Sequence, residues 1–206
     1  MRISRKALKQ SGAALEDAVR RDMNSAMGVA LDNAIFLGTG ANGQPLGVIT
    51  GAATYGITAT ALNAAVTWSA FRAAVVRFMA ANAAGSPDAV RLLIRPEVWA
   101  ALDTALITGT AVSEWDRLIG NIPAGNIAMS TNALAAPAGS PLESSALLTT
   151  SAGGVAPSFV GTWGAVDLIR DPFSDAQSGG LRLTALATVD VTVARPAQRE
   201  VLTDVR

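Results

Sequence analysis

The sequence predicts an α+β fold, because it contains helical and strand-like patterns that do not alternate regularly. Apolar residues recur with helical spacing over residues 13–35, which is long for a domain of this size. Residues 181–194 instead alternate between apolar and polar, as in a strand with one buried face. The patterns between these two segments are short and follow no repeating strand–helix order, which argues against a doubly wound sheet.

The first predicted element is the long helix over residues 13–35. Its acidic residues Glu16 and Asp17 suit the positive end of the helix dipole, and each can pair with Arg20 or Arg21 one turn later. About 23 residues at about 1.5 Å each give a rod roughly 35 Å long. We expect this helix to act as a spine against which sheets pack. Its apolar stripe consists of Leu15, Val19, Met23, Met27 and Leu31.

A glycine-rich turn ends this helix. Glycine and proline are dense in this segment, and they favour turn conformations that a helix cannot continue. The sequence therefore predicts a structural turn, followed by a short strand at residues 48–50 and a loop at 51–61. The residues of the turn are Gly38, Gly40, Gly43, Pro45 and Gly47.

The spacing of Gly38, Gly40 and Gly43 also matches the dinucleotide-binding fingerprint. That fingerprint works when a strand enters the loop and a helix leaves it, so that the helix N-terminus faces the pyrophosphate. Here a helix enters the loop and no helical pattern follows it. We interpret the glycines as a turn. A dinucleotide-binding enzyme that uses the loop of residues 38–43 is kept as an alternative of a different functional class.

The middle of the chain contains shorter elements. Trp68, Phe71 and Val75 have helical spacing, and Pro96 is placed to open a further helix. The expected elements are a helix over residues 68–83, a strand over 89–94, a helix from 96 to 106, short strands over 119–123 and 126–130, and a loop over 135–145.

The last third of the chain is predicted to be mostly strands. Within it Asp167, Asp171 and Asp175 lie four residues apart, which could suggest a metal site. The pair Asp171 and Pro172, with two glycines nearby, is more typical of a turn, and the Ca²⁺-loop pattern is not met. We therefore predict a structural late turn at Asp171 and Pro172 and no metal ligands. The expected strands cover residues 146–150, 158–160, 165–170 and 181–194.

Composition excludes several classes of enzyme. The 206 residues include no cysteine and no histidine, so thiolate and imidazole ligands and a Ser-His-Asp triad are impossible within this chain. Sixteen basic and sixteen acidic residues give no net charge, whereas a free-standing nucleic-acid binder usually has a basic excess. No apolar run is long enough to span a membrane. We expect no catalytic residues, no cofactor and no membrane partner.

Four segments, in collinear order over nearly the whole chain, resemble the major capsid proteins of tailed phages with the Hong Kong 97-like fold, which encapsulin shells share. The spine helix leads into a Gly-Gln-Pro-x-Gly turn, which residues 43–47 match fully. Residues 93–102 are similar to the family's strand, proline and helix step. Residues 168–174 resemble its late Arg-Asp-Pro segment, and residues 189–196 resemble its C-terminal strand.

The resemblance implies a structural subunit that builds an icosahedral head by self-assembly, with the Hong Kong 97-like fold of a long spine helix and mixed, mostly antiparallel sheets. Residues 1–38 would be the spine helix of the peripheral domain, residues 39–154 the axial domain, and residues 155–206 strands that return to both sheets. An encapsulin-like nanocompartment shell protein is the alternative within this fold.

The implied partners are further copies in capsomer rings, other capsid subunits and packaged DNA, the last contacted without sequence specificity. The implied locations are the virion capsid of a phage or prophage and, during assembly, the cytoplasm of the bacterial host. Family members carry an N-terminal arm and an extended loop before the spine helix. Residues matching them are not found here, so the sequence is expected to represent a truncated core.

Overall fold

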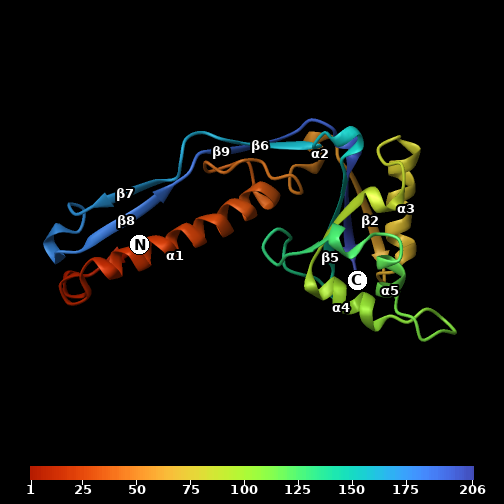
Figure 1. Ribbon diagram of the computed structural model, residues 1–206, viewed down its shortest axis with the longest axis horizontal. Helices are drawn as coiled ribbons and strands as arrows, with labels where there is room; N and C mark the ends of the chain where they lie inside the picture. Colours follow the sequence, from red (N-terminus) through yellow and green to blue (C-terminus); the bar gives the residue numbers. More distant parts are fainter. The chain divides into compact units, whose positions relative to one another are not determined.

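The structure, a computed structural model, describes residues 1–4, 6–7, 9–10, 14–151 and 153–206, and it confirms the α+β class. The chain divides into two compact units (Figure 1). Unit 1 comprises Met1–Asp32 and Gly161–Asp190, and unit 2 comprises Asn33–Val160 and Val191–Arg206. The late strands, which the sequence left undivided, are therefore shared between the two units.

Unit 1 is built on helix α1 (Arg5–Leu37) and a three-stranded antiparallel sheet. The strand order is β1 (Arg2–Ile3), β8 (Leu181–Leu186) and β7 (Asp167–Asp171). One face of the sheet packs against the helix. The buried side chains of this core are Ile3, Val19, Leu181 and Leu183, with Leu15 and Met23 packed against them.

Helix α1 begins earlier than the sequence predicted. The amide of Ala7 donates to the hydroxyl of Ser4 at 3.3 Å, so Ser4 caps the helix start. Glu16 and Asp17 consequently lie well inside the helix, and their expected position in its first turn is wrong. The expected pairing one turn later is present, because Arg20 Nη2 lies 2.8 Å from Glu16 Oε1.

Unit 2 contains a five-stranded mixed sheet. Its strand order is β2 (Thr58–Ala64), β10 (Arg199–Val205), β5 (Ser144–Thr150), β3 (Val90–Ile94) and β4 (Ile127–Met129). Strand β10 pairs in parallel with β2 and antiparallel with β5. The sequence pattern predicted a last strand that ends before residue 196 and did not predict β10, because Arg199 and Glu200 interrupt the apolar pattern.

Both faces of this sheet are covered. On one face the helices α3 (Trp68–Ala80), α4 (Pro96–Thr104) and α5 (Glu114–Ile119) bury a core that includes Phe71, Leu102 and Leu118. On the other face Leu147 and Val201 pack in a second cluster with Val48, Ala52, Ile57 and Val191. The short helix α2 (Ala52–Tyr55) belongs to this second layer.

Several expected elements match the structure, and others require correction. Helix α3, strand β3, helix α4, strand β4 and strand β5 lie where helices and strands were predicted. The predicted strand at residues 48–50 is a turn, because the amides of Val48 and Ile49 donate to the last carbonyls of α1. The predicted strand at 119–123 is instead the end of α5 and a turn, since Ser113 and Asp116 form a capping box that starts this helix.

The predicted single strand over residues 181–194 is two strands. It is interrupted after Leu186, and β9 (Val189–Val193) pairs with β6 (Ser158–Thr162) in a separate two-stranded sheet. Short 3₁₀ helices complete the described elements: Pro87–Ala89, Ala124–Asn126, Ala152–Gly154, Ala176–Ser178 and Pro196–Gln198.

Candidate functional site

The predicted glycine turn fastens the chain to the end of α1. Gly38 donates its amide to Ala34 O at 3.0 Å, and Gly47 donates to Gly38 O at 2.9 Å. Gly40 donates to Pro45 O at 3.1 Å, so the loop closes on itself. A Cβ at Gly38 would collide with the carbonyl oxygens of Pro45 and Ala34. These contacts explain why glycine stands at positions where two stretches of backbone meet.

This geometry differs from that of a dinucleotide-binding loop. A helix enters the turn, and the helix that follows is only Ala52–Tyr55. The amides of Gly38, Gly40 and Gly47 already donate to carbonyls of the chain. Gly43 has a positive φ of 77°, as a turn residue does. The arrangement offers no row of free amides at a helix N-terminus for a pyrophosphate.

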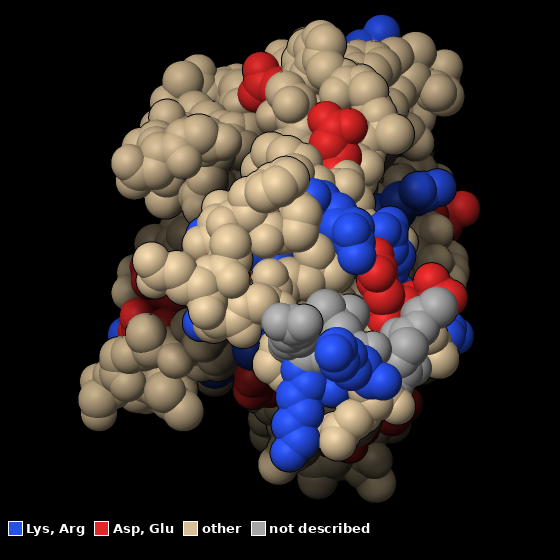
Figure 2. Space-filling view, turned by 90° about the vertical axis from the view of Figure 1, so that its left-hand side faces the viewer, with Lys and Arg blue, Asp and Glu red and all other residues tan. Residues whose placement is uncertain are grey.

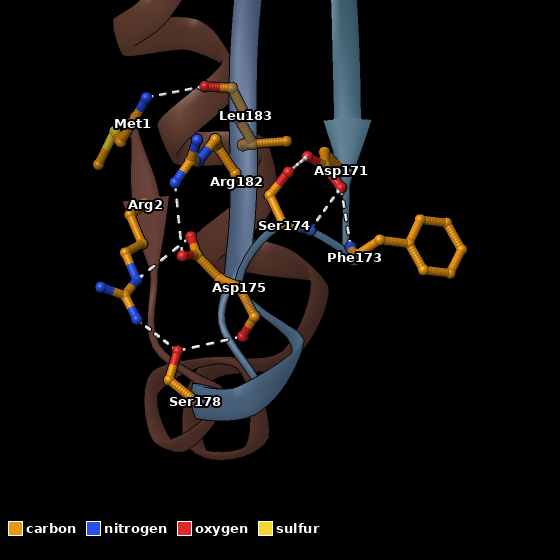
Figure 3. A network of polar contacts seen from close by, with 9 residues as sticks. All are labelled: Met1, Arg2, Asp171, Phe173, Ser174, Asp175, Ser178, Arg182 and Leu183. Atoms are coloured by element: carbon orange, nitrogen blue, oxygen red, sulfur yellow. Dashed lines mark hydrogen bonds and ion pairs between the residues drawn. The ribbon is translucent and has the colours of Figure 1, made fainter.

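The predicted late turn, at the end of β7, holds its shape through Asp171. One carboxylate oxygen of Asp171 accepts from the amide of Phe173 at 2.8 Å and of Ser174 at 3.0 Å, while the other accepts from the Ser174 hydroxyl. This hydroxyl and the two amides hold the pKa of the Asp171 carboxyl below its ordinary value. Pro172 follows in the turn and leaves Phe173 pointing away from the sheet (Figure 3).

A second carboxylate ties this turn to the first strand. Asp175 lies 3.3 Å from Arg2 Nε and 3.4 Å from Arg182 Nη2 (Figure 3). Arg2 also donates to the Ser178 hydroxyl, and the N-terminal ammonium of Met1 donates to Leu183 O at 2.7 Å. Of the three aspartates spaced four apart, Asp171 and Asp175 thus bind protein groups. Within the described part of the chain no cluster of carboxylates is arranged to hold a metal ion.

The turn and the outer face of the unit 1 sheet expose apolar side chains. Phe173 is 83% exposed, the highest value among the large apolar residues in the described part of the chain. Leu181 and Leu183 of β8 point toward α1, so Thr184 and Leu186 of the same strand point to the opposite face. Ile169 of β7 is directly opposite Thr184 and lies on this outer face as well. Trp163 and Val166 are also exposed. Sequence reasoning missed this surface, because Ile169 and Leu186 fit a buried strand equally well.

Unit 2 holds its charged residues differently. Glu200 is buried, and its carboxylate accepts from Arg77 Nε at 3.0 Å and from the Thr60 hydroxyl at 2.9 Å. Arg95 is also buried, and it donates to Thr131 O at 2.8 Å and pairs with both carboxylate oxygens of Glu97. Hydrogen bonds from Arg95 hold the pKa of Glu97 below its ordinary value. These groups brace the fold and leave no free acid–base pair.

Three of the four tryptophans serve packing in unit 2. Trp68 is buried in the core of unit 2, and Trp99 and Trp115 meet edge to face with ring centroids 6.5 Å apart. Trp163 belongs to the exposed set of unit 1. The described helices include none that combines the length and the apolar character needed to cross a membrane.

Comparisons with known proteins agree with this arrangement. The phage capsid family matches residues 1–204. The capsid of an empty GTA particle is 18% identical, with a TM-score of 0.70, over 100% of this chain and 70% of its own. A structure from Gordonia phage Cozz is 12% identical, with a TM-score of 0.61, over 98% and 67%.

An encapsulin likewise shares the fold. The SrpI encapsulin of Synechococcus elongatus is 13% identical, with a TM-score of 0.60, over 99% of this chain and 71% of its own. No curated protein sequence matches the chain significantly. At these identities the solved structures establish the Hong Kong 97-like fold, and the family match establishes what kind of protein carries it. The chain belongs to the phage capsid family: it is a structural subunit of the virion capsid, a shell of many subunits.

Proposed function

We propose that this capsid subunit joins its neighbours through the outer face of unit 1, with the Phe173 turn as the main anchor. The observation that carries the proposal is an aromatic ring exposed to 83% on a turn whose backbone is fixed by Asp171. A fixed turn loses little conformational entropy when a neighbour covers it. A subunit of a closed symmetric shell repeats such a contact around every ring.

The apolar groups around this turn extend the contact. Ile169 and Leu186 lie on the face of the sheet that α1 does not cover, and burying each large apolar side chain contributes about 1.5–3 kcal/mol. Asp175, Arg2 and Arg182 surround the turn with charge, which favours one orientation of a partner over others. This combination of an aromatic centre and a charged rim is typical of protein interfaces.

The roles of the two units follow from the same proposal. Unit 1 would correspond to the peripheral domain and unit 2 to the axial domain, which includes the structural turn from Gly38 to Gly47 at the end of the spine helix. Unit 2 would supply the larger hydrophobic core of the subunit.

The proposed function needs no catalysis and no cofactor. Histidine and cysteine are absent from the sequence, and the described carboxylates that are buried have protein partners. DNA would be contacted through its phosphates and therefore without sequence specificity. On the face drawn in Figure 2, positive side chains lie beside negative ones. Assembly would take place in the cytoplasm of the host, before the virion is complete.

Assembly of a Phe173→Ser variant tests the proposal. Losing the ring should raise the protein concentration needed for particles or rings at least about tenfold, while the melting temperature stays unchanged because the side chain is exposed. Size-exclusion chromatography and electron microscopy give the readout. Leu106→Ser, another exposed apolar side chain but in unit 2, is the matched control. If Phe173→Ser assembles at the same protein concentration as wild type, this turn is not part of the interface.

An encapsulin-like nanocompartment is the second candidate, favoured by the likeness to the SrpI encapsulin. Particles made in bacteria that enclose a specific protein and no DNA would support this candidate. Particles that require DNA-packaging partners and enclose DNA would support the phage head.

A further inference from the structure

A row of polar side chains crosses the unit 2 sheet on one face. Thr149 of β5 is directly opposite Arg91 of β3 on one side and directly opposite Arg199 of β10 on the other. Residues directly opposite each other point to the same face, and neighbouring strands lie about 4.8 Å apart. Two arginine side chains therefore leave the sheet on either side of Thr149, from the face that also carries Leu93 and Leu147.

The hydrogen bonds of this row are incomplete. Arg199 donates to the hydroxyl of Ser158, but its Nε and Nη1 are buried and have no partner among the described residues. The hydroxyl of Thr149 is buried and unpartnered in the same part of the chain. Burial lowers the pKa of Arg199, and among the described residues Arg199 forms no ion pair with a carboxylate. Buried N–H groups without partners are costly for a fold, so an anion beside the Nε and Nη1 of Arg199 would stabilise it.

A cavity opens beside this row. It has a volume of about 420 Å³, and its polar lining residues include Arg91, Asn126 and Thr149. The remaining walls are largely apolar, including Phe36, Leu93 and Leu147. No Asp or Glu is among the described residues that line the cavity. Apolar walls lower the local dielectric constant, which strengthens the attraction between a cation and an anion placed there.

We propose that this cavity is an oxyanion site that binds a phosphate group, with Arg91 as the direct ligand, Thr149 as a hydroxyl donor and Arg199 as the second positive charge. A guanidinium presents paired N–H donors that match phosphate oxygens. A free phosphate ion and the backbone of a nucleic acid both present such oxygens, so both are candidate sources of the phosphate group. The site is separate from the unit 1 surface proposed for assembly, so either proposal can fail without the other.

Titration of the unassembled protein with inorganic phosphate tests the site. At constant ionic strength, with chloride as the reference anion, phosphate should shift the NMR signals of the Arg91 side chain and the Thr149 amide, and should raise the melting temperature. Arg91→Gln should weaken phosphate binding about tenfold or more, as expected for loss of a charged hydrogen bond. Arg72→Gln removes the same charge from the exposed surface of α3, outside the cavity, and should leave binding unchanged.

Two further variants keep the test independent of folding. Thr149→Val removes an unpartnered hydroxyl without changing the size of the side chain, so the free protein should be as stable as wild type while phosphate binding falls about two- to tenfold. Arg199→Met should leave the free protein as stable or make it more stable, because a buried unpaired charge is removed, and should also weaken phosphate binding.

The outcomes separate the sources of the phosphate and the alternatives to it. If a short duplex DNA competes with phosphate in wild type and not in Arg91→Gln, the backbone of nucleic acid is a source; if it does not compete, the ligand is the free ion. The proposal is overturned if phosphate has no effect beyond that of chloride, or if Arg91→Gln and Arg72→Gln respond alike.

Discussion

The two units of the subunit are stabilised in different ways. Unit 2 buries both faces of its sheet and places even its charged Glu200 in the interior with a partner. Unit 1 buries one face only, around Leu183 and Val19 among the described residues, and leaves the other face open. Its ion pairs involve exposed arginines, which contribute little to stability in water. The contrast predicts that unit 2 contributes most of the free energy of unfolding. Under the proposed function, neighbouring subunits would cover the open face of unit 1 and add to its stability.

The largest expected effects come from the same truncation in each unit. Leu148 in unit 2 and Leu183 in unit 1 are both fully buried. Leu148→Ala should lower the free energy of unfolding by about 3–5 kcal/mol, and Leu183→Ala by about 2 kcal/mol, because a thin layer can collapse around the lost atoms. Urea denaturation measures the loss, and hydrogen exchange shows where it acts. Amide hydrogen exchange that rises throughout the chain in both variants would contradict the expected difference in stability between the two units.

Removal of one partner of a charge pair should reveal a second difference in stability between the two units. Glu200→Ala leaves Arg77 without its partner at the edge of the unit 2 core and should cost about 2 kcal/mol. Arg182→Ala in unit 1 removes a pair with an exposed arginine and should change stability by less than about 0.5 kcal/mol. Thermal denaturation at low and high salt measures both. A larger loss for Arg182→Ala would show that the unit 1 network is more than surface charge.

The glycine turn should tolerate no side chain at its closest approach. A Cβ at Gly47 would lie 2.5 Å from Phe36 O, so Gly47→Ala should cost about 1–3 kcal/mol through overpacking. Gly85→Ala is the control, since nothing lies within 4 Å of its added Cβ. Differential scanning calorimetry compares the two. Equal melting temperatures would mean that the turn rearranges without loss.

The smallest expected effect is the pH dependence that Glu16 contributes in unit 1. The hydrogen bond from Arg20, together with the nearby charge of Arg170, holds the pKa of Glu16 below its ordinary value. The ionised carboxylate therefore adds stability at pH values above about 4.3, and this contribution disappears as the pH falls through the lower folded-state pKa. Exchange of amides in β7 should rise in acid, and Glu16→Gln should reduce this dependence. No difference between the variant and wild type would exclude Glu16 as its source.

Strong local patterns could be read from the sequence because their cause lies within a few residues. The stripe from Leu15 to Leu31 predicted α1, and the glycines with Pro45 predicted that the helix ends there. Strand β10 was missed for the opposite reason. Its Glu200 is acceptable inside the protein only because Arg77 and Thr60, far away in the sequence, meet it there.

The exposed surface around Phe173 and the proposed phosphate site also could not be predicted from local sequence patterns. Phe173 was recognisable as a turn neighbour, but its exposure depends on where Asp171 directs the backbone. The row of Arg91, Thr149 and Arg199 exists only through strand register, since the three residues are widely separated along the chain.

The sequence by itself determined the α+β class, the long helix, the turn that ends it and the resemblance to capsid proteins, because helical periodicity, glycine and proline act locally. Only the tertiary structure decided how the late strands divide between the two units, which face of each sheet is open and which charges meet. Those features depend on pairing between distant segments, and their free energies arise from burial and contacts that no short stretch of sequence contains.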